Sequence, residues 1–138
     1  KDPAEAMEKV VLPAREAAAA EGRPAPRVVA TRWVIVAADD EEAWQALLPW
    51  RGLRAPGRLE AVDPEDLRRR ADELPRAEVL GRYAIAAGVD ALVEAYRPLV
   101  QEVGADVVTL QVASLHQEET IAWLGAEVLP RLRGIVAT

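Results

Sequence analysis

The feature that most constrains the fold is the apolar segment Arg27–Ala37, which reads RVVATRWVIVA. It is rich in β-branched residues, and a nearly unbroken apolar run of this length is typical of a strand covered on both faces of a parallel sheet. Similar segments follow at Glu78–Ala87 and Asp106–Ala113. Between the three segments, apolar residues recur at helical spacing. Strands that alternate with helices in this way predict βα units, a parallel sheet and right-handed crossovers.

The helical patterns have recognisable boundaries. The first covers about Pro3–Glu21 and contains Pro13, where we expect a kink or a restart because proline lacks a backbone donor. Asp39 and Asp63 are N-cap residues for two further helices, and another helix begins at Gly88. The apolar positions of the last helix are Ile121, Leu124, Val128, Leu129 and Leu132.

Composition excludes several classes of protein. The chain has 138 residues, a formal net charge of −6 and no basic run beyond Arg68–Arg70, so nucleic acid is not an expected partner. It has no cysteine, which excludes disulfides and thiolate metal sites. We find no apolar run long enough to cross a membrane and no signal-peptide pattern, and therefore expect a cytoplasmic protein.

The segment Trp50–Val62 has neither a strand nor a helix period. It carries Arg51, Arg54 and Arg58 together with glycine and proline, and forms part of an insertion over residues 49–76. A cationic loop in an acidic chain suggests contact with an anion. We interpret Arg51 and Arg54 as solvated loop charges.

Three strands form a small sheet with two open edges, whereas parallel strands need cover on both faces. We therefore predict an α/β fold in which residues 1–138 form a single partial domain. Its parallel βα units would be the C-terminal part of a (β/α)8 TIM barrel, with strands near 27–37, 78–87 and 106–113 and an inserted loop and helix. The missing part of the barrel would be a partner, and the open edges predict oligomers.

Several motifs in the second half resemble a known family. They read RLEAVDPEDLRRRADEL from Arg58, then VLGRYAIA, GADVVTLQ and SLHQEETIAWLGAEVLPRLR. The sequence resembles the C-terminal portion of luciferase-like oxidoreductases that use the deazaflavin coenzyme F420, in the glucose-6-phosphate dehydrogenase-like branch. The resemblance implies hydride transfer between F420 and an anionic substrate. It also implies that the coenzyme is bound mainly by residues of earlier strands outside this chain, which leaves the catalytic residues unknown and this chain inactive alone.

The resemblance also implies a site for the substrate anion. Sugar-phosphate members hold the phosphate with two basic residues, whose positions are similar to those of Arg58 and Arg82. Relatives tend to carry lysine where this chain has Arg58, so the substrate need not be a sugar phosphate. Arg82 falls in the middle of a predicted strand, where an internal salt bridge is the alternative; Arg32 poses the same question.

Further polar residues are expected at the catalytic rim of the barrel. His116 is the only histidine and follows the third predicted strand, near Gln111, Ser114 and Gln117. These side chains are possible ligand contacts, although Ser114 and His116 also suit the start of a helix. Trp50 is a possible lid over the substrate. We expect no metal site.

Two alternatives remain open at this stage. One is a luciferase-like monooxygenase that uses FMN. The other is a non-catalytic α/β module that oligomerises through its sheet edges.

Overall fold

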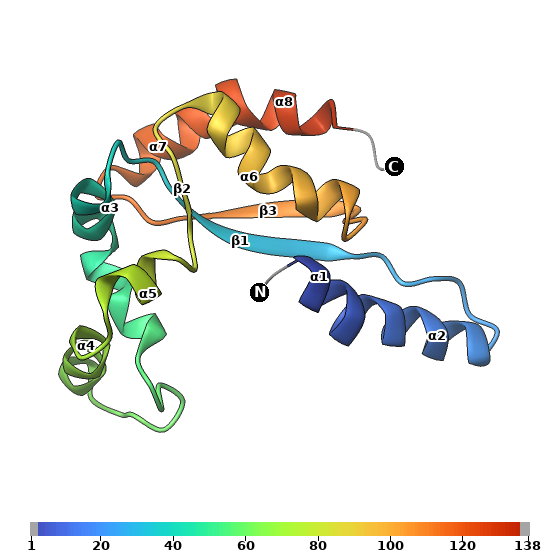
Figure 1. Ribbon diagram of the computed structural model, residues 1–138, viewed down its shortest axis with the longest axis horizontal. Coiled ribbons are helices and arrows are strands. Elements are labelled where there is room, and N and C mark those ends of the chain that lie inside the picture. The colour runs from blue at the N-terminus through green and yellow to red at the C-terminus, as the bar shows by residue number, and fades with distance from the viewer. Residues whose placement is uncertain (1–2, 136–138) are drawn as a thin grey trace.

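A computed structural model describes residues 3–135 and contains a three-stranded parallel sheet (Figure 1). The strands are β1 (Val29–Ile35), β2 (Ala84–Ile85) and β3 (Val107–Val112), in the order β2-β1-β3. The prediction of an α/β fold with a parallel sheet is confirmed. Successive strands of a (β/α)8 barrel lie side by side in sequence order, whereas here β1 is central and β3 pairs with it directly.

Helices cover both faces of the sheet around the carboxyl end of β1. Successive side chains of β1 point to opposite faces and pack against different helices. Val34 is buried against α6 (Val89–Gln101) and the C-terminal helical region, while Ile35 is buried against α3 (Asp40–Leu47) and α5 (Arg76–Leu80). Figure 1 shows α6 running along one side of β1 and β3, with α3 and α5 at the end of the sheet near β2. The remaining helical elements are α1 (Pro3–Ala6), η1 (Met7–Val11), α2 (Leu12–Ala20), η2 (Leu48–Arg54), α4 (Pro64–Asp72), α7 (Gln117–Trp123), η3 (Leu124–Val128) and α8 (Leu129–Arg133).

Two prolines are accommodated in long helices in the same way. Pro13 and Pro130 each stand two residues after a π-helical turn, η1 and η3 respectively. In each turn the closing bond spans five residues; Leu12, for example, donates its N–H to the carbonyl of Met7. A proline lacks a donor and crowds the carbonyl four residues before it, and a widened turn relieves that crowding. The interruption expected at Pro13 is therefore a π turn within a helix that continues.

The predicted helix boundaries are largely confirmed. Asp39 Oδ1 accepts the N–H of Glu42 at 2.9 Å, and Asp63 Oδ1 accepts that of Glu65 at 2.9 Å. Gly104 ends α6 with φ +64°, in the left-handed region that favours glycine.

The strand predicted over Glu78–Ala87 is wrong in its first half. Pro75 begins the short helix α5, and its carbonyl accepts the N–H groups of Glu78 and Val79 at 3.0 and 3.2 Å. From this helix Val79 and Leu80 reach the core, which explains why the segment is apolar. Only Ala84–Ile85 is strand.

Two smaller predictions also need correction. Ile121, placed on the buried stripe of the last helix, is 55% exposed. The segment from Trp50 is not wholly irregular, because η2 is a 3₁₀ helix that continues to Arg54 before the chain turns.

One part of the sheet has no cover. β1 pairs with β3 along Val29–Val34 but with β2 only at Val34 and Ile35. The amino-terminal half of β1 therefore lacks a strand partner on the β2 side. On the sheet face opposite α6, Val29 and Val107 are exposed.

Candidate functional site

The two arginines predicted to bind an anion lie at one hollow. It has a volume of about 410 Å³ and is enclosed by the turn after η2 on one side and by α5 on the other. Its lining residues are Arg54, Ala55, Pro56, Gly57, Arg58, Leu59, Glu60, Leu74, Glu78 and Arg82. Three guanidinium groups and two carboxylates at one hollow form a locally cationic site on an acidic chain.

A second hollow of about 880 Å³ adjoins the first, and Arg54 and Arg82 line both. Its other lining residues are Pro3, Thr31, Arg32, Trp33, Gly81, Leu99 and Gln111. It lies along the part of β1 where β2 no longer covers the edge. The open stretch of sheet and the arginine hollow are thus parts of one continuous surface.

The sequence predicts that Arg82 lies in the middle of a strand, and this prediction is wrong. Arg82 lies in the turn between α5 and β2, and its Nη2 donates to Glu78 Oε1 at 2.8 Å in an exposed pair. Among residues 3–135, Arg82 therefore forms no internal salt bridge, because its partner is a surface carboxylate one helical turn away. An exposed pair of this kind contributes little to stability, so the guanidinium can exchange Glu78 for another anion.

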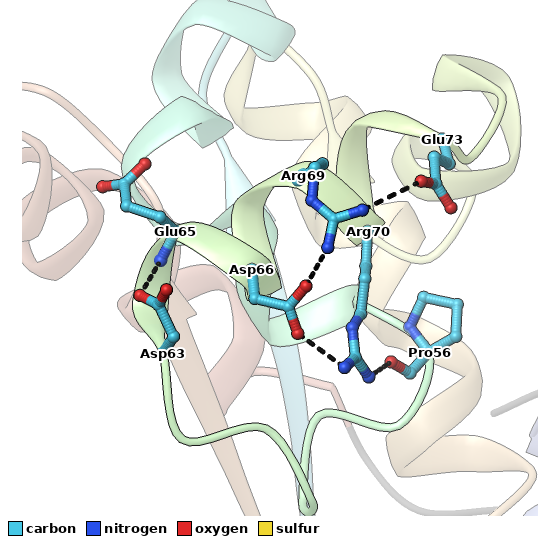
Figure 2. A network of polar contacts seen from close by, with 7 residues as sticks. All are labelled: Pro56, Asp63, Glu65, Asp66, Arg69, Arg70 and Glu73. Carbon is cyan, nitrogen blue, oxygen red and sulfur yellow. Dashed lines mark hydrogen bonds and ion pairs between the residues drawn. The ribbon is translucent and has the colours of Figure 1, made fainter.

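Arg58 projects from the turn that follows Gly57, whose φ of +63° requires glycine. Arg70 of α4 anchors this turn: it donates to the carbonyl of Pro56 at 3.3 Å and pairs with Asp66, as Figure 2 shows. Within residues 3–135, the Arg58 side chain forms neither a hydrogen bond nor an ion pair. Within the described part of the chain it is thus an exposed cation without a partner that lines the hollow.

The sequence predicts a solvated loop charge at Arg54, whereas in the structure this side chain has a defined position. Its Nε donates to the hydroxyl of Tyr83 at 3.0 Å, and the guanidinium lies over the Tyr83 ring at 4.9 Å from the centroid. Tyr83 is buried and meets Trp33 edge to face, with ring centroids 6.2 Å apart. The contact joins residues 29 positions apart, which no local pattern reveals. The spacing of Arg54 and Arg58, four residues apart, is the only signal that could have suggested a shared site.

For Arg32 the sequence suggests a salt bridge inside the protein, but the structure shows other partners. Its Nη1 donates to the carbonyl of Ala95 at 2.9 Å, while the Arg32 carbonyl accepts the hydroxyl of Tyr96 at 3.0 Å. Burial raises the pKa of Tyr96, so this phenol remains a neutral donor. Among the described residues, the Arg32 guanidinium therefore bonds a backbone carbonyl of α6 and pairs with no carboxylate.

The predicted rim residues lie apart from the arginines, with one exception. Ser114 Oγ accepts the N–H of His116 at 3.0 Å and bonds the hydroxyl of Thr120 at 2.9 Å, which closes the turn into α7. Ser114, His116 and Gln117 follow the carboxyl end of β3 and line neither hollow. Gln111, by contrast, lines the second hollow with Arg82.

Trp50 also lies away from both hollows. It packs against the buried cluster around Ile35 and, with Leu67, lines a separate hollow of about 200 Å³ between η2 and α4. Trp50 is therefore part of the contact between those helices. It does not cover either arginine-lined hollow, so it does not form the predicted lid over the substrate.

A bidentate ion pair fixes η2 on α4. Arg51 donates to the two carboxylate oxygens of Asp72 at 2.6 and 3.1 Å, and to the carbonyl of Leu48 at 2.7 Å. The hydrogen bond from Arg51 lowers the pKa of Asp72. Because η2 ends at Arg54, this pair helps to place the arginine hollow.

The described residues supply binding groups and no evident catalytic pair. Within residues 3–135, no group of three histidine or acidic side chains is arranged to hold a metal ion. In the same part of the chain, no helix is both long and apolar enough to span a bilayer. What the arrangement can do chemically is hold an anion, since guanidinium groups bind phosphate and carboxylate through paired hydrogen bonds.

Comparisons with known proteins establish the fold only. No protein-family profile matches the sequence, and no curated protein matches it. Among solved structures, the chain is similar to an F420-dependent secondary alcohol dehydrogenase in complex with an F420–acetone adduct, with a TM-score of 0.74 and 22% identity. The match covers 95% of this chain but 40% of that one. The chain therefore spans well under half the length of the protein it matches and shares the fold of that part.

Proposed function

We propose that this chain is the C-terminal part of a (β/α)8 barrel in a luciferase-like oxidoreductase that transfers hydride between coenzyme F420 and an anionic substrate. The observation that carries the proposal is the similarity of nearly the whole chain to part of an F420-dependent dehydrogenase. The shared hollow of Arg58 and Arg82 supports it independently, because these are the two positions at which the family resemblance implies anion binding.

In this proposal the residues of this chain bind and orient the substrate. Among residues 3–135, Arg58 has no competing partner and Arg82 has only an exposed one, so both can turn to an incoming phosphate or carboxylate. The coenzyme would supply the hydride chemistry and would be bound mainly by residues outside this chain. Holding the substrate in a fixed orientation is the contribution that such a site makes to the reaction rate.

The branch of the family and the assembly are part of the same proposal. A glucose-6-phosphate dehydrogenase-like member would use a sugar phosphate or a related anion, whereas the name of the structural neighbour indicates that it acts on secondary alcohols. We further propose a cytoplasmic homo-oligomer.

The test is expression of the complete reading frame that contains this sequence, followed by titration with F420. We expect the product to bind F420 and to reduce it only when an anionic substrate is added, with glucose 6-phosphate as the first substrate to try. Failure to bind F420 would contradict the proposal. Tight binding of FMN in a parallel titration would instead support the luciferase-like monooxygenase.

A second candidate is a non-catalytic module that self-associates through its sheet. The exposed Val29 and Val107 and the unpaired edge of β1 favour it, because open edges and apolar sheet faces are sites of association. Light scattering coupled to size exclusion measures the oligomeric state. A stable oligomer whose complete gene product binds neither coenzyme would favour this candidate.

A further inference from the structure

We propose that Arg54 is the fixed anion-binding residue of this site and that it selects phosphate monoesters with a flat apolar body. This inference rests on the proposed function and deepens it by naming the class of substrate. The phosphate would lie among Arg54, Arg58 and Arg82 in the first hollow, and the body would extend into the second hollow beside Trp33.

The position of Arg54 is the first argument. Arg54 and Arg82 line both hollows, so these two side chains stand where the hollows meet. A ligand that extends from one hollow to the other passes both guanidinium groups. Arg58, in contrast, lines the first hollow and not the second.

The second argument is that Arg54 is held in place before any ligand arrives. Its Nε is bonded to the Tyr83 hydroxyl and its plane lies over the Tyr83 ring. Tyr83 is 5% exposed and belongs to the same buried cluster as Ile35. Among the described residues, neither terminal amino group of Arg54 has a hydrogen-bond partner. The four N–H donors of these two amino groups match the oxygens of a phosphate, and a guanidinium that is already held in place requires little ordering on binding.

The other two arginines have different properties. Within residues 3–135, Arg58 has no partner that would hold its guanidinium in place before a ligand binds. Arg82 must exchange Glu78 for the ligand. Glu60 and Glu78 also line the hollow and repel any anion, so the ligand must accept hydrogen bonds from all three arginines. A phosphate monoester has three terminal oxygens for this, whereas a carboxylate has two. The site therefore favours a phosphate monoester over a carboxylate.

The second hollow indicates the nature of the rest of the ligand. Trp33, Leu99 and Pro3 supply apolar surface there. Trp33 is only partly buried and forms an edge-to-face pair with the Tyr83 ring. An aromatic or otherwise flat group can pack against Trp33 while Thr31 and Gln111 contact its polar atoms.

Isothermal titration of the whole chain with three probes tests the proposal: inorganic phosphate, phenyl phosphate and benzoate. For the wild type we expect phenyl phosphate to bind more tightly than either of the others. Arg54→Gln should weaken binding of both phosphates by about tenfold or more, the effect of losing hydrogen bonds from a charged group. Arg23→Gln, at an exposed arginine paired with Glu21 and outside both hollows, is the matched control and should leave affinity unchanged.

Two further variants separate binding from folding. Tyr83→Phe keeps every charge and the buried ring but removes the hydroxyl that holds Arg54, and should weaken phosphate binding several-fold. Trp33→Leu should weaken phenyl phosphate while leaving inorganic phosphate unchanged. Circular dichroism confirms that each variant is folded.

Different outcomes would overturn different claims. If Arg54→Gln binds phosphate as the wild type does while Arg58→Gln does not, the role of Arg54 is overturned and the proposed anion site stands. Benzoate binding as tight as that of phenyl phosphate overturns the choice of a phosphate monoester. Absence of binding of all three probes to the wild type overturns both this inference and the proposed anionic substrate.

Discussion

The sheet with its covering helices and the segment Leu48–Leu74 are stabilised in different ways. Around the sheet, side chains such as Ile35, Leu92 and Tyr96 have no exposed surface. Within Leu48–Leu74, the only buried apolar residues are Ala55 and Ala71, which are 3% and 0% exposed and among the smallest side chains. Ion pairs provide many of the contacts that hold this segment in place. The pair with the clearest geometry is Arg51–Asp72.

This difference explains where a ligand can bind. Burial of large apolar side chains supplies most of the free energy of folding and tolerates little rearrangement. Exposed ion pairs contribute less and exchange partners readily. The segment that carries Arg54 and Arg58 is thus the less stable of the two regions, as expected for binding elements. Changes in the core should lower global stability, whereas changes in the segment should alter local order and binding.

Truncation of a leucine in each region should show the contrast most strongly. Leu92→Ala removes a fully buried side chain from α6 and should lower the free energy of unfolding by about 2–5 kcal/mol. Leu67→Ala, in the partly buried side of α4, should cost about 1 kcal/mol. Urea unfolding followed by circular dichroism measures both. Equal losses would show that the two regions form one uniform core.

A smaller effect is expected when a polar contact within the core is removed. Tyr96→Phe keeps the buried ring but removes the hydroxyl that donates to the Arg32 carbonyl. The loss should be about 1 kcal/mol in the free energy of unfolding, with no change in phosphate binding. A loss of anion affinity would contradict the separation between core and site.

Gly57→Ala tests the turn that carries Arg58. The backbone at Gly57 has φ +63°, and an added Cβ would stand 2.9 Å from Nη1 of Arg70. We expect a local cost of about 1 kcal/mol and faster proteolysis at residues 55–62, with the global unfolding midpoint nearly unchanged. Gly125→Ala in η3, where the added Cβ meets nothing within 4 Å, is the control and should not increase cleavage. Equal cleavage of the two variants would contradict this account.

Asp72→Asn should have the smallest effect on stability. Since Arg51 lowers the pKa of Asp72 in the folded state, the ion pair stabilises the fold above the ordinary carboxyl pKa and loses this effect as the pH falls below it. The exposed pair should contribute about 0.5 kcal/mol at neutral pH. The difference in unfolding free energy between variant and wild type should shrink as the pH falls below the ordinary aspartate pKa and disappear once the pH is below the lowered pKa of Asp72. A difference that persists there would exclude the ion pair as its cause.

The sequence was sufficient for features that depend on local chemistry. The N-caps at Asp39 and Asp63 and the helix end at Gly104 follow from single residues, and each is present. The strands around Trp33 and Leu110 were predicted from apolar, β-branched runs. Each of these patterns is read over a few adjacent residues.

Features that depend on distant contacts were missed. Val79 and Leu80 read as strand because they are apolar, but Pro75 starts a helix that buries them equally well. The position of Arg54 depends on its contact with Tyr83. The position of β3 beside β1 depends on the edge of the sheet to which the connection after α6 returns. Neither a pairing partner nor a contact across 29 residues leaves a local pattern.

Hydrogen exchange measured by mass spectrometry, with and without inorganic phosphate, tests the central claim most directly. Without phosphate, amides of β1, β3 and α6 should exchange slowly and those of residues 55–62 rapidly. Phosphate should slow exchange around Arg54, Arg58 and Arg82 and leave the turn at Ser114–Gln117 unchanged. Protection at Ser114–Gln117 instead, or uniform exchange throughout the chain, would contradict the division into a stable sheet and an anion-binding segment.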